Sequence, residues 1–197
     1  VADLDTLPFP AWDLVDLDVY AREATWAGAL RERRYAPVLT SRGCPYGCTF
    51  CHNVFGKTVR RRSASNILDE LRLLHRDHGV REVHILDDIF NADAADAAGF
   101  MRRLIDAGLG LSIAFPNGLR ADLMTADLIT LFKAAGTYKI NYGVETVSPR
   151  LQETIGKRLD VPRALAMIDR TSRAGIITGA YFMLGFPTQT EREIMET

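Results

Sequence analysis

A repeated pattern of short apolar runs and amphipathic helices constrains the fold of this 197-residue chain most strongly. Five apolar runs are predicted to be β-strands, and each is followed by a loop and a segment with helical periodicity. The runs span residues 36–41, 82–86, 111–115, 138–144 and 177–184. Such an alternation predicts an α/β fold with a parallel sheet covered by helices. Right-handed crossovers permit either an open doubly wound sheet or a curled, barrel-like one.

Capping residues and glycines predict where the helices begin and end. We expect Pro116, Asn117 and Gly118 to break the third strand, because proline and glycine disrupt regular pairing. The expected helix starts lie near Ser65, Asn91 or Asp93, Thr125, Ser148, Pro162 and Thr190. The expected helix ends lie at Gly79, Gly108, Gly136 and Gly175.

Polar residues or glycines directly follow each predicted strand. The carboxyl ends of parallel strands meet at one edge of a sheet, and function in such folds concentrates there. We therefore expect these residues to converge on a single site. They are Cys44, the pair Asp87 and Asp88, Asn117, Glu145, and the run Gly185, Phe186 and Pro187.

All three cysteines of the chain lie within eight residues, with the spacing C-x3-C-x2-C. An odd number of thiols does not suit a disulfide framework. A closed zinc site usually needs four ligands. A 4Fe–4S cluster normally takes four cysteines, so a cluster held by Cys44, Cys48 and Cys51 would leave one iron open. A small molecule can bind and be reduced at such an open iron.

Composition excludes several classes of protein. The net charge of −1 gives no electrostatic reason to expect a nucleic acid or an acidic membrane as partner. No apolar run reaches the roughly 18 residues of a membrane span, and the first residues do not form a secretory signal. Clustered free thiols favour a reducing compartment, hence the cytoplasm. The chain lacks an initial Met and stops abruptly at Thr197, so we expect a fragment.

The cysteine motif, with the aromatic Phe50 before the third cysteine, resembles the signature of the radical S-adenosylmethionine (SAM) superfamily, and the likeness covers about residues 35–197. It implies a partial parallel (β/α)6 TIM-like barrel, truncated here after about five strands. It also implies a 4Fe–4S cluster on Cys44, Cys48 and Cys51, with SAM chelated at the open iron. One electron would cleave SAM to methionine and a 5′-deoxyadenosyl radical, which abstracts hydrogen from a substrate.

The same resemblance implies the first SAM contacts. Phe50 would pack on the adenine; the alternative is an ordinary core phenylalanine. Asp87 and Asp88 stand where the family often has Gly-Gly-Glu, and would accept hydrogen bonds from the SAM ammonium. These two residues depart from the family motif, and their alternative role is an acid pair that stabilises a helix N-terminus.

Further contacts are implied at the third, fourth and fifth strand ends. Glu145 would reach the ribose hydroxyls or the methionyl end of SAM, or be a surface acid. Asn117 and Arg120 lie where the third strand meets the site, and Arg120 would pair with the SAM carboxylate or be solvated. Gly185 and Pro187 belong to a motif whose backbone contacts adenine, or to a simple turn that ends a strand.

Residues 1–34 are predicted to be a lead-in to a core at residues 35–197 that is incomplete at its C-terminus. The lead-in, with one short helix expected within residues 19–33, resembles the linker that follows a cobalamin-binding domain in part of the superfamily. That subfamily includes methyltransferases, oxidative cyclases and ring-remodelling enzymes. Cobalamin is therefore a possible cofactor, bound by a domain upstream of Val1.

Two other functions stay open at this point. The first is a cobalamin-dependent radical SAM methyltransferase. The second is a non-catalytic module that holds an iron–sulfur cluster or zinc, with His52 as a fourth zinc ligand. A radical SAM enzyme needs an electron donor such as flavodoxin or ferredoxin, and its substrate is not identified by the sequence. Lys57 and the arginines of residues 60–62 are expected to be a solvated run, or a site for an anionic substrate or a reductase.

Overall fold

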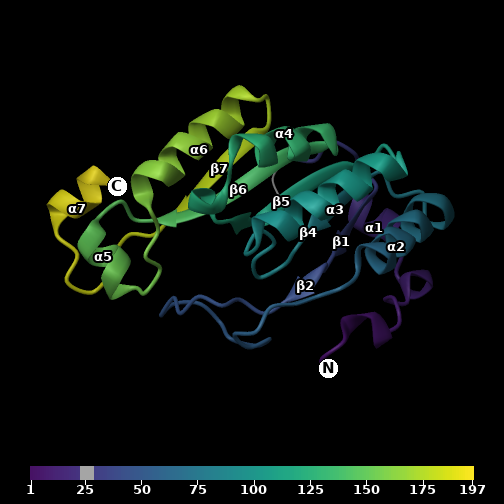
Figure 1. Cartoon of the computed structure of the whole chain (residues 1–197), viewed down its shortest axis with the longest axis horizontal. Helices are drawn as coiled ribbons and strands as arrows, with labels where there is room; N and C mark the ends of the chain where they lie inside the picture. Colours follow the sequence, from purple (N-terminus) through teal and green to yellow (C-terminus); the bar gives the residue numbers. More distant parts are fainter. Residues whose placement is uncertain (23–28) are drawn as a thin grey trace.

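The computed structural model describes residues 1–22 and 29–197, and a five-stranded parallel sheet forms its centre (Figure 1). Strands that follow one another along the chain are also neighbours in this sheet. A doubly wound sheet reverses direction at a switch point, whereas this order is that of a barrel wall. The predicted α/β class and partial barrel are confirmed. The strands are β1 (Tyr35–Val38), β4 (Glu82–Ile85), β5 (Ser112–Leu119), β6 (Thr137–Glu145) and β7 (Ile177–Phe182).

Four long helices lie side by side along the sheet in Figure 1, and a core of buried side chains joins them to it. At its centre Phe90, Phe115 and Phe132 pack with ring centroids 4.9–5.9 Å apart. The four helices are α2 (Ala64–Asp77), α3 (Ala94–Ala107), α4 (Ala126–Ala134) and α6 (Val161–Arg173). The short elements are α1 (Leu17–Arg22), α5 (Pro149–Thr154), α7 (Glu191–Glu196) and the 3-10 helices Leu4–Thr6, Trp12–Leu14 and Ala121–Leu123.

The helix starts agree with the predicted capping pattern. Asp93, rather than Asn91, caps α3 and accepts from two backbone amides. Thr190 forms the predicted capping box with Glu193 at α7. Side-chain caps stand at Ser63 for α2, Thr125 for α4, Ser148 for α5 and Asp160 for α6.

The third strand does not end where the sequence predicted. β5 continues through Pro116, Asn117 and Gly118 to Leu119, with a shift of register against β6. The Pro116 carbonyl accepts hydrogen bonds from the Tyr181 hydroxyl at 2.6 Å and from the Asn141 amide at 3.1 Å. These side-chain donors stabilise the irregular strand, which a local proline–glycine pattern does not reveal.

The first predicted strand is two strands. β1 ends at Val38, and β2 (Ser41–Arg42) pairs antiparallel with β3 (Arg60–Arg61). This small ladder closes the base of the loop that carries the cysteines.

The three arginines of the basic run make structural contacts, so the prediction of a solvated run is wrong for residues 60–62, whereas Lys57 is exposed. Arg60 donates to the Phe55 carbonyl at 2.7 Å, and Arg61 donates to the Phe90 carbonyl at 2.7 Å. Arg62 pairs with the buried Glu70 at 2.5 Å. These contacts half-bury the three side chains, because each guanidinium satisfies carbonyls or a carboxylate of the fold.

The lead-in lies against the barrel through a few specific contacts. The Trp12 indole donates to Glu70 on α2 at 3.0 Å. The helix expected within residues 19–33 matches α1 only in its first part. Residues 23–28 lie outside the described residues, and residues 29–34 are not helical. In the described part of the chain, no helix is both long and apolar enough to span a membrane.

A buried carboxylate joins the lead-in to the amino end of the sheet. Glu82, fully buried at the start of β4, accepts from the backbone amides of Arg31 and Glu32 at 2.8 and 2.7 Å. It is also 2.6 Å from both the Tyr138 hydroxyl and the His84 ring. Burial acts to raise the pKa of Glu82, but these hydrogen bonds outweigh it and hold the pKa below its ordinary value.

Replacing Glu82 by glutamine is expected to lower the free energy of unfolding by about 1–3 kcal/mol at neutral pH, because the amide leaves buried donors without an acceptor. A depressed folded-state pKa stabilises the fold above the unfolded value of 4.5, and that contribution is lost as the pH falls through the folded pKa. The difference between wild type and Glu82→Gln should therefore shrink on acidification. Urea unfolding followed by circular dichroism from pH 7 downward measures it. The exposed Glu153→Gln is the control, and equal losses in both variants would contradict the assignment.

Candidate functional site

The cysteines lie on a loop between β2 and β3, and hydrogen bonds within this loop connect its two halves. In Figure 1 this dark blue segment runs below the strands toward α5. The Cys44 amide donates to the Gly56 carbonyl at 3.2 Å, and Lys57 donates to the Tyr46 carbonyl. All three cysteines are free thiols, and Cys51 is exposed.

A cavity of about 210 Å³ lies between this loop and the carboxyl ends of β4, β5 and β6. A second cavity of about 250 Å³ adjoins it and shares four lining residues. Together they fall within the roughly 300–1,000 Å³ range of small-molecule sites. The predicted residues that line the first cavity are Cys44, Cys48, Phe50, Cys51, Asp88, Asn117, Arg120 and Glu145.

The two adjacent aspartates have different environments. Asp87 is buried and accepts from the Thr40 and Ser41 hydroxyls at 2.5 and 2.6 Å. Burial raises its pKa, and these hydrogen bonds oppose the rise. Asp88 lines both cavities, accepts from the Gly43 amide at 2.9 Å and lies 3.6 Å from the His52 ring. Asp88 is therefore the acid that a ligand in the first cavity meets.

Glu145 lies at the end of β6 beside a cation that no sequence pattern indicated. Lys157 approaches it at 2.9 Å, and both side chains are about 10% exposed. Glu145 has a positive φ of 69°, an unusual backbone state for a residue with a side chain. Gly143 makes room for the pair, since a Cβ there would lie 2.7 Å from the Lys157 ammonium. Lys157 lies twelve residues after Glu145 and belongs to no motif, so the sequence gave no signal for it.

Lys157 also acts on the cysteine loop. Burial raises the pKa of the Cys48 thiol, and the nearby Lys157 ammonium opposes this rise. Positive charge near a thiol favours the thiolate, which is the form that binds metal.

Arg120 is neither solvated nor free. Its guanidinium makes a two-point ion pair with Asp122 at 3.0 and 2.7 Å and donates to the Lys157 carbonyl at 2.9 Å. The same group lies over the Tyr46 ring, 4.0 Å from its centroid. The expected alternative of a solvated arginine is wrong. Because Asp122 already occupies the guanidinium fork, Arg120 lines the cavity mainly as a support.

Asn117 projects from the irregular part of β5 into both cavities. Its amide nitrogen donates to the Leu86 carbonyl at 2.8 Å. The amide oxygen is an acceptor that this hydrogen bond does not use. Tyr181 of β7 also lines the first cavity; the alternation of side chains along that strand was the signal that could have identified it.

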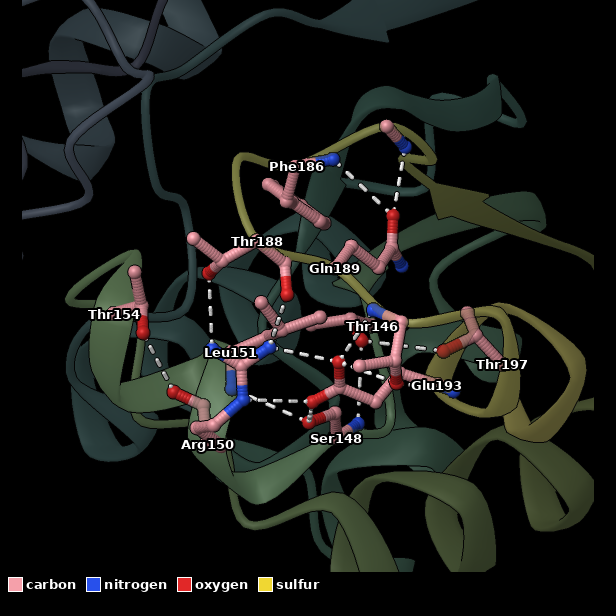
Figure 2. A network of polar contacts seen from close by, with 12 residues as sticks. Thr146, Ser148, Arg150, Leu151, Thr154, Phe186, Thr188, Gln189, Glu193 and Thr197 are labelled. Carbon is pink, nitrogen blue, oxygen red and sulfur yellow. Dashed lines mark hydrogen bonds and ion pairs between the residues drawn. The ribbon is translucent and has the colours of Figure 1, made fainter.

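Gly185 and Pro187 are exposed and lie outside the lining of both cavities. Figure 2 shows the segment that contains them in a polar network between α5 and α7. The Gly185 amide donates to Gln189 at 2.7 Å, and Arg150 pairs with Glu193 at 2.7 Å. Arg150 holds the pKa of Glu193 well below its usual range. The predicted adenine contact of Gly185 and Pro187 stays a prediction, and these bonds support a structural turn.

The donor chemistry of the loop fits a cluster. Three free thiols line one cavity, with no fourth cysteine in the chain. Each thiolate of a cubane cluster binds its own iron, so the thiols must surround a volume rather than meet at a point. Within residues 1–22 and 29–197, no three His, Cys, Asp or Glu side chains gather around a single ion position.

The family is identified by comparison. The sequence model of the radical SAM superfamily matches residues 38–197. The chain therefore belongs to the radical SAM superfamily. This family uses a 4Fe–4S cluster and SAM, in agreement with the predicted cofactors.

Two related sequences are named as methyltransferases. An uncharacterized methyltransferase, PH0819, of Pyrococcus horikoshii is 29% identical over 199 residues, which cover 100% of this chain and 41% of the relative. Cytidylyl-2-hydroxyethylphosphonate methyltransferase of Streptomyces wedmorensis is 31% identical over 189 residues, covering 94% of this chain and 35% of the relative. The chain thus spans less than half the length of these curated relatives.

The fold is shared with a solved structure. The radical SAM methyltransferase TsrM from Kitasatospora setae, solved with cobalamin and a [4Fe-4S] cluster, superposes with a TM-score of 0.75. The two sequences are 21% identical, and the match covers 90% of this chain and 34% of TsrM.

The buried pair of Glu145 and Lys157 predicts a coupling that can be measured. Each of Glu145→Gln and Lys157→Met is expected to cost about 3 kcal/mol of unfolding free energy, because either leaves a buried charge unpaired. The double variant should be more stable than the sum predicts, with a coupling of about 1–3 kcal/mol in urea unfolding. The exposed pair of Glu153 and Arg158, 3.0 Å apart, is the matched control. Its coupling should stay under about 1 kcal/mol. Additive losses at Glu145 and Lys157 would show that they do not form a pair.

Proposed function

We propose that this chain is the cluster-binding and SAM-binding core of a radical SAM enzyme. The observation that carries the proposal is the single cavity lined by three free cysteines and by polar residues from the ends of three strands. When bound, the cluster supplies the electron that cleaves SAM to methionine and a 5′-deoxyadenosyl radical. Hydrogen abstraction from a substrate follows from this class of chemistry.

The side chains divide the work between holding the cluster and orienting SAM. The thiolates of Cys44, Cys48 and Cys51 hold the cluster. Asp88 and the amide oxygen of Asn117 supply acceptors suited to the SAM ammonium, because a charge-assisted hydrogen bond is stronger than a neutral one.

The remaining groups of the cavity suit the nucleoside and carboxylate of SAM. Glu145 accepts from the ribose hydroxyls, as acidic residues do in dinucleotide sites. Lys157, held beside it, and Arg120 are the cations of the cavity lining that suit the SAM carboxylate. Phe50 is 44% exposed and lines the cavity, where it offers an aromatic face to the adenine.

The setting of the reaction follows from its chemistry. One-electron reduction requires a donor such as flavodoxin or ferredoxin. Three free thiols are stable in a reducing compartment, and we place the enzyme in the cytoplasm. Residues 1–34 serve as the lead-in to the core at residues 35–197.

A cobalamin-dependent methyltransferase is the second candidate. It is supported by relatives named as methyltransferases at 29% and 31% identity. Cobalamin would be bound outside these residues. Product analysis of the protein that contains this chain separates the two functions: methylated substrate with S-adenosylhomocysteine indicates methyl transfer, and 5′-deoxyadenosine without methylation indicates hydrogen abstraction.

Anaerobic reconstitution of the chain with iron and sulfide is expected to give a brown protein with about four irons, which cleaves SAM when reduced. Cys48→Ala should lose the cluster, since two thiolates remain, whereas His52→Ala should keep it. Iron and sulfide analysis, absorbance, and chromatography of 5′-deoxyadenosine measure these outcomes.

A colourless protein with one zinc would instead identify the non-catalytic metal module. Loss of metal in both Cys48→Ala and His52→Ala would indicate a four-ligand site that includes the imidazole.

A further inference from the structure

The cysteine loop rests on a turn that follows α5, at residues 155–158. The Thr49 amide, inside the cysteine motif, donates to the Ile155 carbonyl at 2.9 Å. Gly156 has a φ of 67° and faces Gly47 so closely that an added Cβ would lie 2.8 Å from the Gly47 carbonyl oxygen. The same Cβ would lie 4.0 Å from the Cys48 Cα. Backbone therefore packs directly on backbone at the middle cysteine.

Arg120 joins the turn to the loop from the other side. It donates to the carbonyls of Lys157 and Arg158 at 2.9 and 3.3 Å. Its guanidinium lies 4.0 Å from the centroid of the Tyr46 ring, and Tyr46 stands between the first and second cysteines. The ion pair with Asp122 fixes the guanidinium in this position. One buried cation thus contacts both segments at once.

The turn is itself rigidly attached to the end of β6. The buried Gln152 amide donates to the Val144 and Thr146 carbonyls at 2.9 and 2.6 Å, and its oxygen accepts from the Leu159 amide at 3.1 Å. Helix α5 is also bound to α7 through the pair of Arg150 and Glu193 (Figure 2). Because α5 is anchored on both sides, it can transmit the position of the sheet to the cysteine loop.

We propose that residues 155–158 and Arg120 form a bracket that sets the position of the cysteine loop against the end of β6. It contacts that loop at two points: Gly156 packs on Gly47, and Arg120 packs on the Tyr46 ring. The inference rests on the proposed function, since the loop is taken to hold the cluster. A loop held in one conformation loses less entropy when three thiolates bind a rigid cluster, and supports of this kind orient metal ligands.

Gly156→Ala tests the bracket, with Gly108→Ala as its matched control. Both glycines have a positive φ, 67° and 60°, so alanine brings the same backbone strain at each. Only Gly156 has a neighbour that the new methyl group would overlap, whereas Gly108 faces open space. Because both variants carry the same backbone strain, a difference between them reports the displacement of the cysteine loop.

The readouts are the rate of iron release to a chelator from the anaerobically reconstituted chain and the electron paramagnetic resonance spectrum of the reduced cluster. Gly156→Ala is expected to release iron about tenfold faster than Gly108→Ala and to change the spectrum. Equal release rates and an unchanged spectrum would overturn the bracket. Urea unfolding of the apo chain shows whether the two variants differ in general stability.

Tyr46 provides a second test that avoids the backbone. Tyr46→Phe keeps the ring that Arg120 contacts and should release iron at the wild-type rate. Tyr46→Leu removes the ring and should release iron several times faster, about the effect of losing one cation–π contact. Equal rates for phenylalanine and leucine would overturn the role of Arg120. A wild-type chain that binds no iron would instead overturn the proposed function, and it would be recognised before any variant is compared.

Discussion

Every strand of the central sheet runs in the same direction, and consecutive strands are neighbours. Right-handed crossovers of this kind leave each strand end at one rim, because each helix returns the chain to the opposite edge. The loops after β1, β4, β5 and β6 therefore meet, although their residues are tens of positions apart. The cavity between Cys44, Asp88, Asn117 and Glu145 is a consequence of that direction. If the strands did not all run in one direction, the three thiols on one loop would not face residues from the other strand ends.

The two ends of the sheet contribute differently. At the amino end, Glu82 collects donors from the lead-in and from β6, and every contact is internal. At the carboxyl end, Glu145 and Asp88 keep part of their surface on a cavity. This division, with stability at one face and chemistry at the other, is usual for barrels. It places buried hydrogen bonds where no ligand must enter.

The rim is built by supports as much as by ligand-facing groups. Asp87 and Asp88 are adjacent, yet their carboxylates accept from different groups. Asp87 therefore fixes Thr40 and Ser41 at the entry to the cysteine loop, and Asp88 lines the cavity. Arg120 satisfies its charge on Asp122 and so supports the turn at residues 157–158. The close backbone contact at Gly156 adds a constraint of shape rather than of charge.

The sequence by itself determined the cluster motif, the class of fold and the existence of the five parallel strands, because thiol spacing and hydrophobic period are local properties. It also identified Asp88, Asn117 and Glu145, since position after a strand predicts the rim. Tertiary structure alone decided that Lys157 pairs with Glu145, that Arg120 is a support, that the arginines of residues 60–62 are half-buried, and that β5 continues past Pro116. Each of these depends on a partner in another element or loop, such as the Phe90 carbonyl for Arg61 and the Lys157 carbonyl for Arg120. The partner's position follows from packing between elements, and no local pattern encodes it.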